Sequence, residues 1–103
     1  MPLTWAEKGQ FQYSGSVDSG TEIRYGMGHK IRVTKEQYAL LRTHFKCKTV
    51  PIGTSRTCPP PNSLGKWLLK NVSKVAIASY VGPILIIEGY AFKEGEHDIR
   101  IIK

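Results

Sequence analysis

The residues with the clearest chemical potential in this sequence are basic side chains, which gather in the middle of the chain. Residues 30–74 hold ten lysines and arginines against one acidic residue, Glu36, a local net charge of +9. Residues 1–29 and 75–103 each carry a net charge of −1, so the middle accounts for the whole +7 of the 103-residue chain. A polyanion is therefore the class of partner that the charge pattern predicts.

Within this basic middle, residues 53–57 (Gly-Thr-Ser-Arg-Thr) have the composition of a phosphate-binding loop. Glycine lets backbone N–H groups approach a phosphate, hydroxyls donate hydrogen bonds, and arginine can bond bidentately. The alternative for this loop is an exposed segment held by local Ser and Thr hydrogen bonds. The alternative for the whole basic stretch is a surface that only maintains solubility. Eleven residues of the middle become candidate nucleic-acid contacts: Lys30, Arg32, Arg42, Lys46, Lys48, Thr54, Ser55, Arg56, Lys66, Lys70 and Lys74.

Groups suited to catalysis or metal binding are sparse. His44 and Cys47 lie one helical turn apart and could join Cys58 and His29 around zinc, but the usual paired Cys-x-x-Cys is missing. The few acidic residues before residue 88 do not form the carboxylate cluster that a hard cation needs. We therefore expect no catalytic residues, no metal site and no cofactor, and a protein that is not an enzyme.

The elements that must position the basic residues begin with β-structure in the first third of the chain. Apolar and polar residues alternate over residues 10–17 and again over 21–25, with Asp-Ser-Gly between them as a turn, so a β-hairpin is predicted. Residues 31–33 predict a short third strand. Four aromatic residues either fill the core, the more common case, or stack on the bases of a single strand: Trp5, Tyr13, Tyr25 and Tyr38.

A helix is predicted over residues 35–45. Thr34 and Gln37 form a capping box, the pattern that marks a helix N-terminus. Tyr38, Leu41 and Phe45 then fall on one face at helical spacing, which leaves the basic residues to the other face.

Residues 46–62 predict a long loop, because Pro51, Gly53 and the run of three prolines at 59–61 disfavour any regular element. A short helix capped by Asn62 or Ser63 is predicted to follow. Its apolar and basic residues separate onto different faces. The apolar face holds Leu64, Trp67 and Leu68, and the other holds Lys66 and Lys70.

Residues 74–88 admit two interpretations. Ser73 as a cap and Gly89 as a stop favour a helix, kinked near Pro83. Two buried strands joined at Gly82-Pro83 are the alternative, because proline inside a helix costs about 3 kcal/mol. We favour the helix. Residues 90–92 and 98–102 then predict a hairpin whose turn contains Gly95.

This order of elements resembles that of a winged helix-turn-helix DNA-binding domain. The likeness covers residues 34–103, with 63–68 as the second helix, Ser73 as the turn, 79–81 within the third helix, 86–90 as its exit and 92–101 as the wing. The resemblance implies that the third helix enters the DNA major groove and that the wing touches the backbone. Carried over by position, Ser73, Lys74, Ile77, Ala78 and Ser79 would face DNA, which adds Ser79 to the candidate contacts.

These observations predict one α+β domain over residues 1–103, with an N-terminal β-hairpin, two or three helices and a C-terminal β-hairpin in a winged-helix-like arrangement. The expected function is binding of nucleic acid, with double-stranded DNA as the partner and residues 30–74 on the phosphate backbone. The alternative is a protein-interaction module or small homo-oligomer, such as a homodimer, that meets an acidic partner and shares its apolar segment 75–87.

The sequence also bears on where the protein acts. No apolar run approaches the length of a membrane-spanning helix, and the first ten residues lack the apolar core of a signal peptide. We therefore expect a cytoplasmic protein without a membrane partner, in which Cys47 and Cys58 are reduced thiols.

Overall fold

The computed structural model describes residues 2–55 and 57–103, which form three helices and two three-stranded antiparallel sheets. The first sheet has the order β1-β2-β3 and the second has the order β4-β6-β5. The elements are β1 (Gln12–Ser16), β2 (Gly20–Tyr25), β3 (His29–Val33), α1 (Lys35–Phe45), β4 (Thr49–Pro51), α2 (Leu64–Asn71), α3 (Ala78–Ile87), β5 (Ala91–Glu94) and β6 (Asp98–Ile101).

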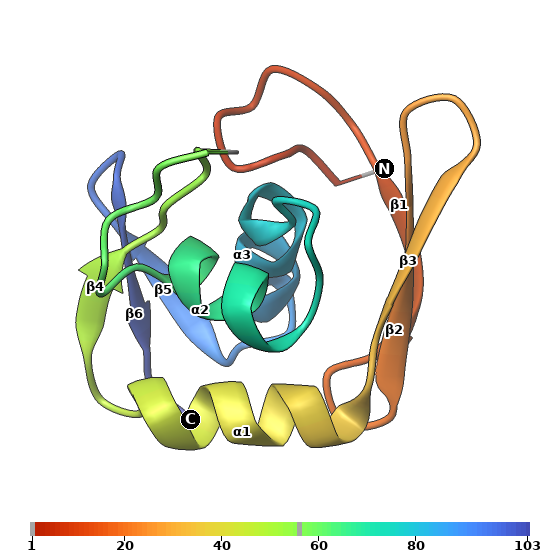
Figure 1. Ribbon diagram of the computed structural model, residues 1–103. Helices are drawn as coiled ribbons and strands as arrows, with labels where there is room; N and C mark the ends of the chain where they lie inside the picture. Colours follow the sequence, from red (N-terminus) through yellow and green to blue (C-terminus); the bar gives the residue numbers. More distant parts are fainter. Residues whose placement is uncertain (1, 56) are drawn as a thin grey trace.

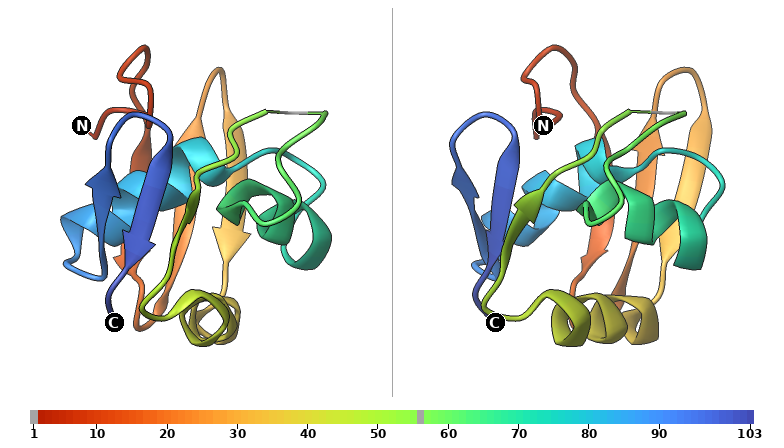
Figure 2. Two further views of the ribbon diagram at one scale, coloured as in Figure 1. Left: turned by 90° about the vertical axis from the view of Figure 1, so that its left-hand side faces the viewer. Right: turned by 60° about the vertical axis from the view of Figure 1, so that its left-hand side comes forward.

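The two sheets stand on opposite sides of the molecule with α3 between them (Figure 1). Helix α1 runs across one end, from the first sheet towards the second, and α2 lies beside α3. The β5–β6 hairpin and β4 form the side that Figure 2 turns towards the viewer. Helix α3 is therefore the central element of the fold.

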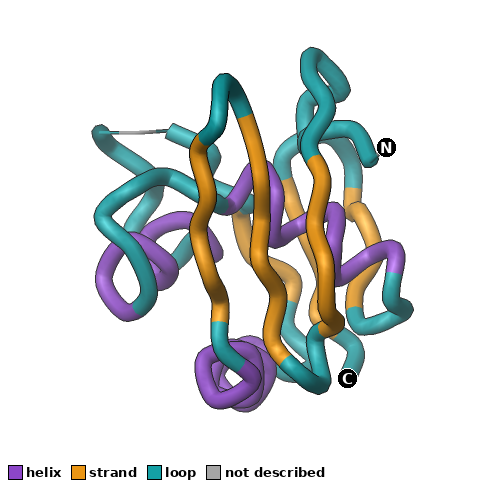
Figure 3. The backbone as a smooth tube through the Cα atoms, turned by 90° about the vertical axis from the view of Figure 1, so that its right-hand side faces the viewer, coloured by secondary structure: helices purple, strands orange, loops and turns teal. Residues whose placement is uncertain are grey.

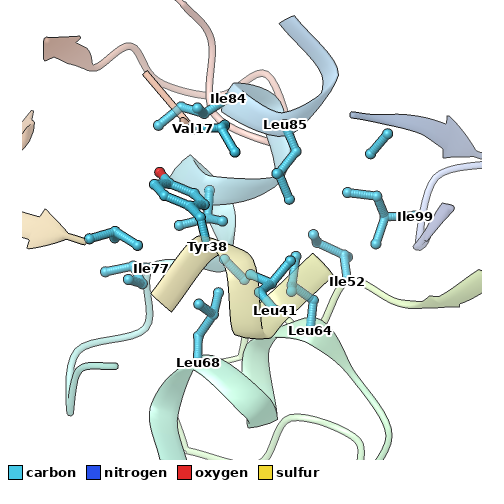
Figure 4. Packing of buried hydrophobic residues seen from close by; sticks show 14 of the residues in the cluster. Val17, Tyr38, Leu41, Ile52, Leu64, Leu68, Ile77, Ile84, Leu85 and Ile99 are labelled. Carbon is cyan, nitrogen blue, oxygen red and sulfur yellow. The ribbon is translucent and has the colours of Figure 1, made fainter. Parts of the chain in front are cut away.

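Buried apolar side chains form one cluster to which both sheets and all three helices contribute (Figure 4). Ile23 of β2, Leu41 of α1, Leu68 of α2, Leu85 of α3 and Ile99 of β6 are all fully buried. Because every layer shares this cluster, the positions of α1, α2 and β4 relative to one another are fixed by core packing.

The α+β class, the N-terminal hairpin, the third strand and the helix over residues 35–45 are confirmed. The α1 capping box has both of its bonds: the Gln37 backbone N–H donates to Thr34 Oγ1 over 3.1 Å, and the Thr34 N–H donates to Gln37 Oε1 over 2.9 Å. Tyr38, Leu41 and Phe45 are buried, as their spacing predicts. These signals are local, and the tertiary fold agrees with them.

The prediction that residues 46–62 hold no regular element is wrong for Thr49–Pro51, which form β4. Val50 pairs with Ile99 of β6, and Pro51, which lacks an N–H, ends the strand opposite Asp98. Proline is tolerated there because β4 is an edge strand with β6 on one side only. The pairing partner lies about fifty residues away in the sequence, where no local pattern could reveal it.

The helical interpretation of residues 74–88 is confirmed in type, although α3 begins only at Ala78. Ser73 does not cap it, because the Ser73 hydroxyl accepts the N–H of Val75 instead, over 3.1 Å. Pro83 lies inside the helix and cannot donate to the carbonyl four residues earlier. That carbonyl, on Ser79, accepts the backbone N–H of Trp5 over 3.0 Å, so an N-terminal residue replaces the lost helical bond.

Gly89 ends α3, as predicted, with a positive φ of 81°. The N–H of Tyr90 donates to the Leu85 carbonyl over 2.8 Å and that of Gly89 to the Ile86 carbonyl over 3.1 Å, which is a Schellman C-cap. The chain then enters the predicted C-terminal hairpin, formed by β5 and β6.

The end of α3 is tied to β1 through Glu88, whose carboxylate accepts the Tyr13 hydroxyl over 2.9 Å and the Val17 N–H over 2.8 Å. Burial, together with the hydrogen bond to Glu88 and the charge of that carboxylate, raises the pKa of Tyr13 from 10.0 to about 12. The folded protein therefore holds this proton at a pH where the unfolded chain releases it.

We expect the free energy of unfolding to fall as the pH rises from 10 to 12, and Tyr13→Phe to make that fall shallower. Below pH 10 both states keep the proton, so this contribution to stability is then fully present. Urea titrations of both proteins across this range measure the difference. A residual fall should persist in the variant because burial also raises the pKa of Tyr38. Identical pH dependence in the two proteins would contradict the role given to Tyr13.

Candidate nucleic-acid groove

A groove of about 850 Å³ lies where the C-terminal end of α1, strand β4 and helix α2 meet. Its charged lining side chains are three lysines, Lys48, Lys66 and Lys70. Among the described residues that line it, there is no aspartate or glutamate. The remaining lining residues are aromatic, apolar or neutral polar: His44, Phe45, Thr49, Val50, Pro51, Pro61, Asn62, Ser63, Trp67 and Asn71.

Helix α2 presents two of these lysines because its two faces differ as the sequence predicts. Leu64 and Leu68 are fully buried, whereas Lys66 and Lys70 are exposed. The Ser63 hydroxyl caps the helix by accepting the Lys66 N–H over 3.0 Å. The lysines are one turn apart, about 6 Å along the helix axis, and both border the groove.

The start of α2 is fixed against the chain segment that follows β4. The Gly65 N–H donates to the Ile52 carbonyl over 2.8 Å, and the Ser63 hydroxyl donates to the Pro60 carbonyl over 2.7 Å. A Cβ atom on Gly65 would lie 1.7 Å from the Gly53 carbonyl oxygen, so only glycine permits this approach. The N–H groups of Gly65, Lys66 and Trp67 in the first turn are thus satisfied within the protein, which leaves little of this helix N-terminus for an anion.

The third lysine, Lys48, comes from the turn between α1 and β4. Cys47 adopts a φ of 61° in this turn, and its N–H donates to the Ile101 carbonyl over 2.8 Å. The Lys48 N–H donates to the Phe45 carbonyl over 2.9 Å, and the Lys48 carbonyl accepts the Ile101 N–H over 3.1 Å. Backbone bonds to α1 and β6 therefore set the position of Lys48 at the groove.

Three rings form an aromatic cluster inside the groove. The Trp67 ring centroid lies 6.2 Å from Phe45, edge to face, and 6.3 Å from His44, tilted by 31°. His44 and Phe45 meet edge to face at 4.6 Å. Phe45 is buried, Trp67 is half-buried and His44 is exposed, so the cluster reaches from the core to the surface. Sequence reasoning assigned Trp67 only to an apolar helix face, although its position between Lys66 and Lys70 was a usable signal.

The fold separates the other candidate basic residues from this groove. Lys30 and Arg32 lie on the outer face of the first sheet, which no other element covers (Figure 3). The Glu22 carboxylate lies 3.6 Å from both the Arg32 and the Arg24 guanidinium, so that face carries an internal neutralising charge. The continuous basic stretch of sequence therefore divides between two sides of the molecule.

Arg42 is engaged within the protein. Its Nε donates to the Lys103 carbonyl over 2.7 Å, and its guanidinium carbon lies 4.3 Å from the centroid of the Tyr90 ring. Asp18 lies 3.9 Å from the same guanidinium and accepts the Tyr90 hydroxyl over 2.8 Å. This cluster holds α1 against the C-terminal hairpin and the β1–β2 turn.

Four further candidates, Lys46, Thr54, Ser55 and Ser79, are not among the residues that line the groove. Thr54 and Ser55 are exposed, and Ser55 Oγ accepts the Cys58 N–H over 3.1 Å, as in a locally stabilised loop. Arg56 lies outside the described residues. Lys46 is exposed at the C-cap of α1. Ser79 is half-buried in α3.

Lys74 lines a second hollow, of about 530 Å³, together with residues of β2, β3 and α3. Tyr25 lines this hollow too, stacked on Tyr80 at 4.8 Å and on His29 at 5.3 Å between centroids. These rings join β2 and β3 to α3, the packing role that sequence analysis considered the more common one for aromatic residues.

Across residues 2–55 and 57–103, no three His, Cys, Asp or Glu side chains lie close enough together to hold a metal ion. Cys47 and Cys58 are free thiols. Within the same residues, no helix has the length and apolar character needed to cross a bilayer.

Comparison with known proteins adds no relative: no family model matches this chain, and no curated protein or solved structure is significantly similar to it.

Proposed function

We propose that this protein binds nucleic acid through the groove between α1, β4 and α2. The observation that carries the proposal is the meeting of Lys48, Lys66 and Lys70, from two distant segments, on a groove without a carboxylate in its described lining. Like charges placed together are unfavourable to the folded protein on its own, so their gathering is best accounted for by an anionic partner. Among polyanions, nucleic acid matches both the charge and the aromatic cluster.

Among the described residues that line the groove, the cations are lysines and not arginines, and this bears on the kind of recognition. Lysine carries a compact charge on a flexible stem, whereas arginine offers a rigid fork for bidentate contacts with guanine. Three lysines therefore suit contacts with phosphates, which position a nucleic acid without reading its sequence. We propose binding with little sequence preference.

The proposed docking surface differs from the one that the winged-helix resemblance implies. In that mode Ile77 and Ala78 would touch DNA, but both are buried, with 0% and 1% of their surface exposed. Tyr80 of the same helix packs against the ring of Phe11, just before β1, and that of Tyr25 in β2. The hairpin in the place of the wing carries Glu94, Glu96 and Asp98, which phosphates would repel. The groove, in contrast, has exposed lysines, Lys48, Lys66 and Lys70, and no carboxylate among its described lining residues.

Binding to fluorescently labelled duplex and single-stranded DNA, followed by anisotropy at low and moderate salt, tests the proposal. We expect a dissociation constant below about 10 μM at low salt and a steep loss of affinity as salt rises, because bound lysines release condensed counterions. Absence of binding to either DNA at both salt concentrations would overturn the proposed function.

A contact between proteins is a second candidate function, favoured by exposed apolar side chains near the C-terminal hairpin. Ile87, Phe92 and Ile102 are 56%, 41% and 38% exposed, and β5 is an unpaired sheet edge. Exposed apolar residues beside a sheet edge are typical of surfaces that associate. Light scattering at high concentration tests this candidate, since a strictly monomeric mass would count against a homodimer.

A further inference from the structure

The aromatic cluster gives the groove a property that phosphate binding does not require. Trp67 is half-buried on the lining, and its ring contacts two neighbouring rings, Phe45 at 6.2 Å and His44 at 6.3 Å between centroids, which also contact each other. Lys66 and Lys70 flank it in the sequence and line the same groove. A flat apolar ring bordered by cations matches a nucleotide, which joins a flat base to an anionic phosphate.

Access to the face of a base distinguishes the forms of nucleic acid that can use this ring. A volume of about 850 Å³ is in the range of sites that enclose a small molecule, roughly 300–1,000 Å³. In a duplex the bases are paired and stacked inside, and a protein reaches the face of one only by extruding it. An unpaired strand presents its bases without that cost, so a single strand can combine stacking on Trp67 with phosphate contacts more favourably than a duplex.

We infer that the groove binds single-stranded nucleic acid, with one base stacked on Trp67 and the neighbouring phosphates on Lys48, Lys66 and Lys70. The inference rests on the proposed function and names the form of its ligand. It differs from the duplex DNA that the sequence led us to expect. The chemistry is shared by DNA and RNA, because a base and a phosphate are common to both.

The polar groups around the ring indicate that this binding tolerates many sequences. The Asn71 side-chain amide donates to the Trp67 carbonyl over 2.9 Å, and the Ser63 hydroxyl is used in capping α2. The exposed Asn62 amide and the side-chain oxygen of Asn71 remain for a base edge. Stacking accepts any base, and these two groups give little discrimination among bases.

The test compares three fluorescently labelled probes in anisotropy titrations of the intact protein: a single-stranded DNA, a single-stranded RNA of the same sequence, and the corresponding blunt DNA duplex. We expect at least one single strand to bind about tenfold or more tightly than the duplex. Tryptophan emission should change on addition of the single strand. Trp5 is 5% exposed, so such a change reports Trp67, and it should disappear in Trp67→Phe.

A substitution that removes the ring tests the stacking contact. Trp67→Leu should weaken single-strand binding roughly tenfold or more, a larger loss than the same variant shows for the duplex. Phe92→Leu is the matched control, because it removes an exposed aromatic ring that lies outside the groove lining. Circular dichroism verifies that both variants fold. If Trp67→Leu does not fold, the emission change of the unaltered protein still decides the question.

The outcomes separate the two proposals. A duplex bound as tightly as the single strands, with no change in tryptophan emission, would overturn the single-strand inference and leave the proposed function standing. Equal losses in Trp67→Leu and Phe92→Leu would likewise overturn it. No binding of any probe would overturn the proposed function, and this inference with it.

Discussion

Replacing Lys48, Lys66 and Lys70 together by glutamine is expected to weaken nucleic-acid binding roughly 100-fold at about 0.1 M salt. For single strands the logarithm of the binding constant falls with the logarithm of salt concentration at about 0.7 per neutralised phosphate. If the three lysines each neutralise one phosphate, their loss should reduce the slope by about 2. Anisotropy titrations at several salt concentrations give both the affinity and the slope.

The matched control removes three other exposed lysines, in Lys8→Gln, Lys30→Gln and Lys35→Gln combined. This variant loses the same net charge from positions outside the groove lining. It should keep most of its affinity, because at about 0.1 M salt the attraction between DNA and lysines more than about 10 Å from the groove is largely screened, whereas lysines in direct contact with phosphates are screened much less. An equal loss in both variants would mean that total charge, and not the groove, determines binding. Unchanged affinity in the groove variant would remove these lysines from the site.

Gly65→Ala is expected to destabilise the fold by about 3 kcal/mol. At an ordinary helix position this substitution stabilises, because alanine has the higher helix propensity by about 1 kcal/mol. Here the added Cβ would lie 1.7 Å from the Gly53 carbonyl oxygen and 2.7 Å from the carbonyl carbon, both backbone atoms that no side-chain rotation can move. The start of α2 or the loop before it must shift, which also breaks the Gly65 to Ile52 hydrogen bond. Urea unfolding measures the change.

Gly9→Ala is the control for this prediction. Its nearest contacts would be Thr4 side-chain atoms at 3.9 and 4.0 Å, an ordinary van der Waals distance. We expect a change of less than about 0.5 kcal/mol in its free energy of unfolding. A Gly65→Ala protein as stable as the unaltered one would show that the two segments can separate at little cost.

The elements that the sequence predicts well are those with local signals. Thr34 and Gln37 mark the start of α1 three residues apart, and Gly89 marks the end of α3 because its positive φ suits a residue without a Cβ. The β1–β2 turn and the β5–β6 turn are likewise encoded within a few residues. In each case the physical cause and the sequence signal lie in the same short segment.

The groove was not predictable in the same way, because its parts come from separate segments. Lys48 is positioned by backbone hydrogen bonds between residues 47–48 and Ile101, which lies more than fifty residues later in the sequence. Strand β4 is not recognisable from the sequence, because it contains Pro51, a residue that disfavours strands. The basic residues look continuous along the chain, but β3 directs Lys30 outward on one side while α2 directs Lys66 outward on another. In the sequence Arg42 looks like the other basic residues. In the fold its guanidinium is not free for a ligand, because it packs on the Tyr90 ring and lies beside the Asp18 carboxylate.

The position of β6 in the second sheet determines when that sheet can form during synthesis. Strands β4 and β5 pair only with β6, so the sheet cannot form before residues 98–101 leave the ribosome. The N-terminal segment also contacts this sheet only late in synthesis, because the Trp5 indole N–H donates to the Glu96 carbonyl in the β5–β6 turn, over 2.7 Å and a sequence separation of 91 residues. Until then α3 lacks the sheet that covers one of its sides, and its apolar surface is open to chaperones and to other nascent chains.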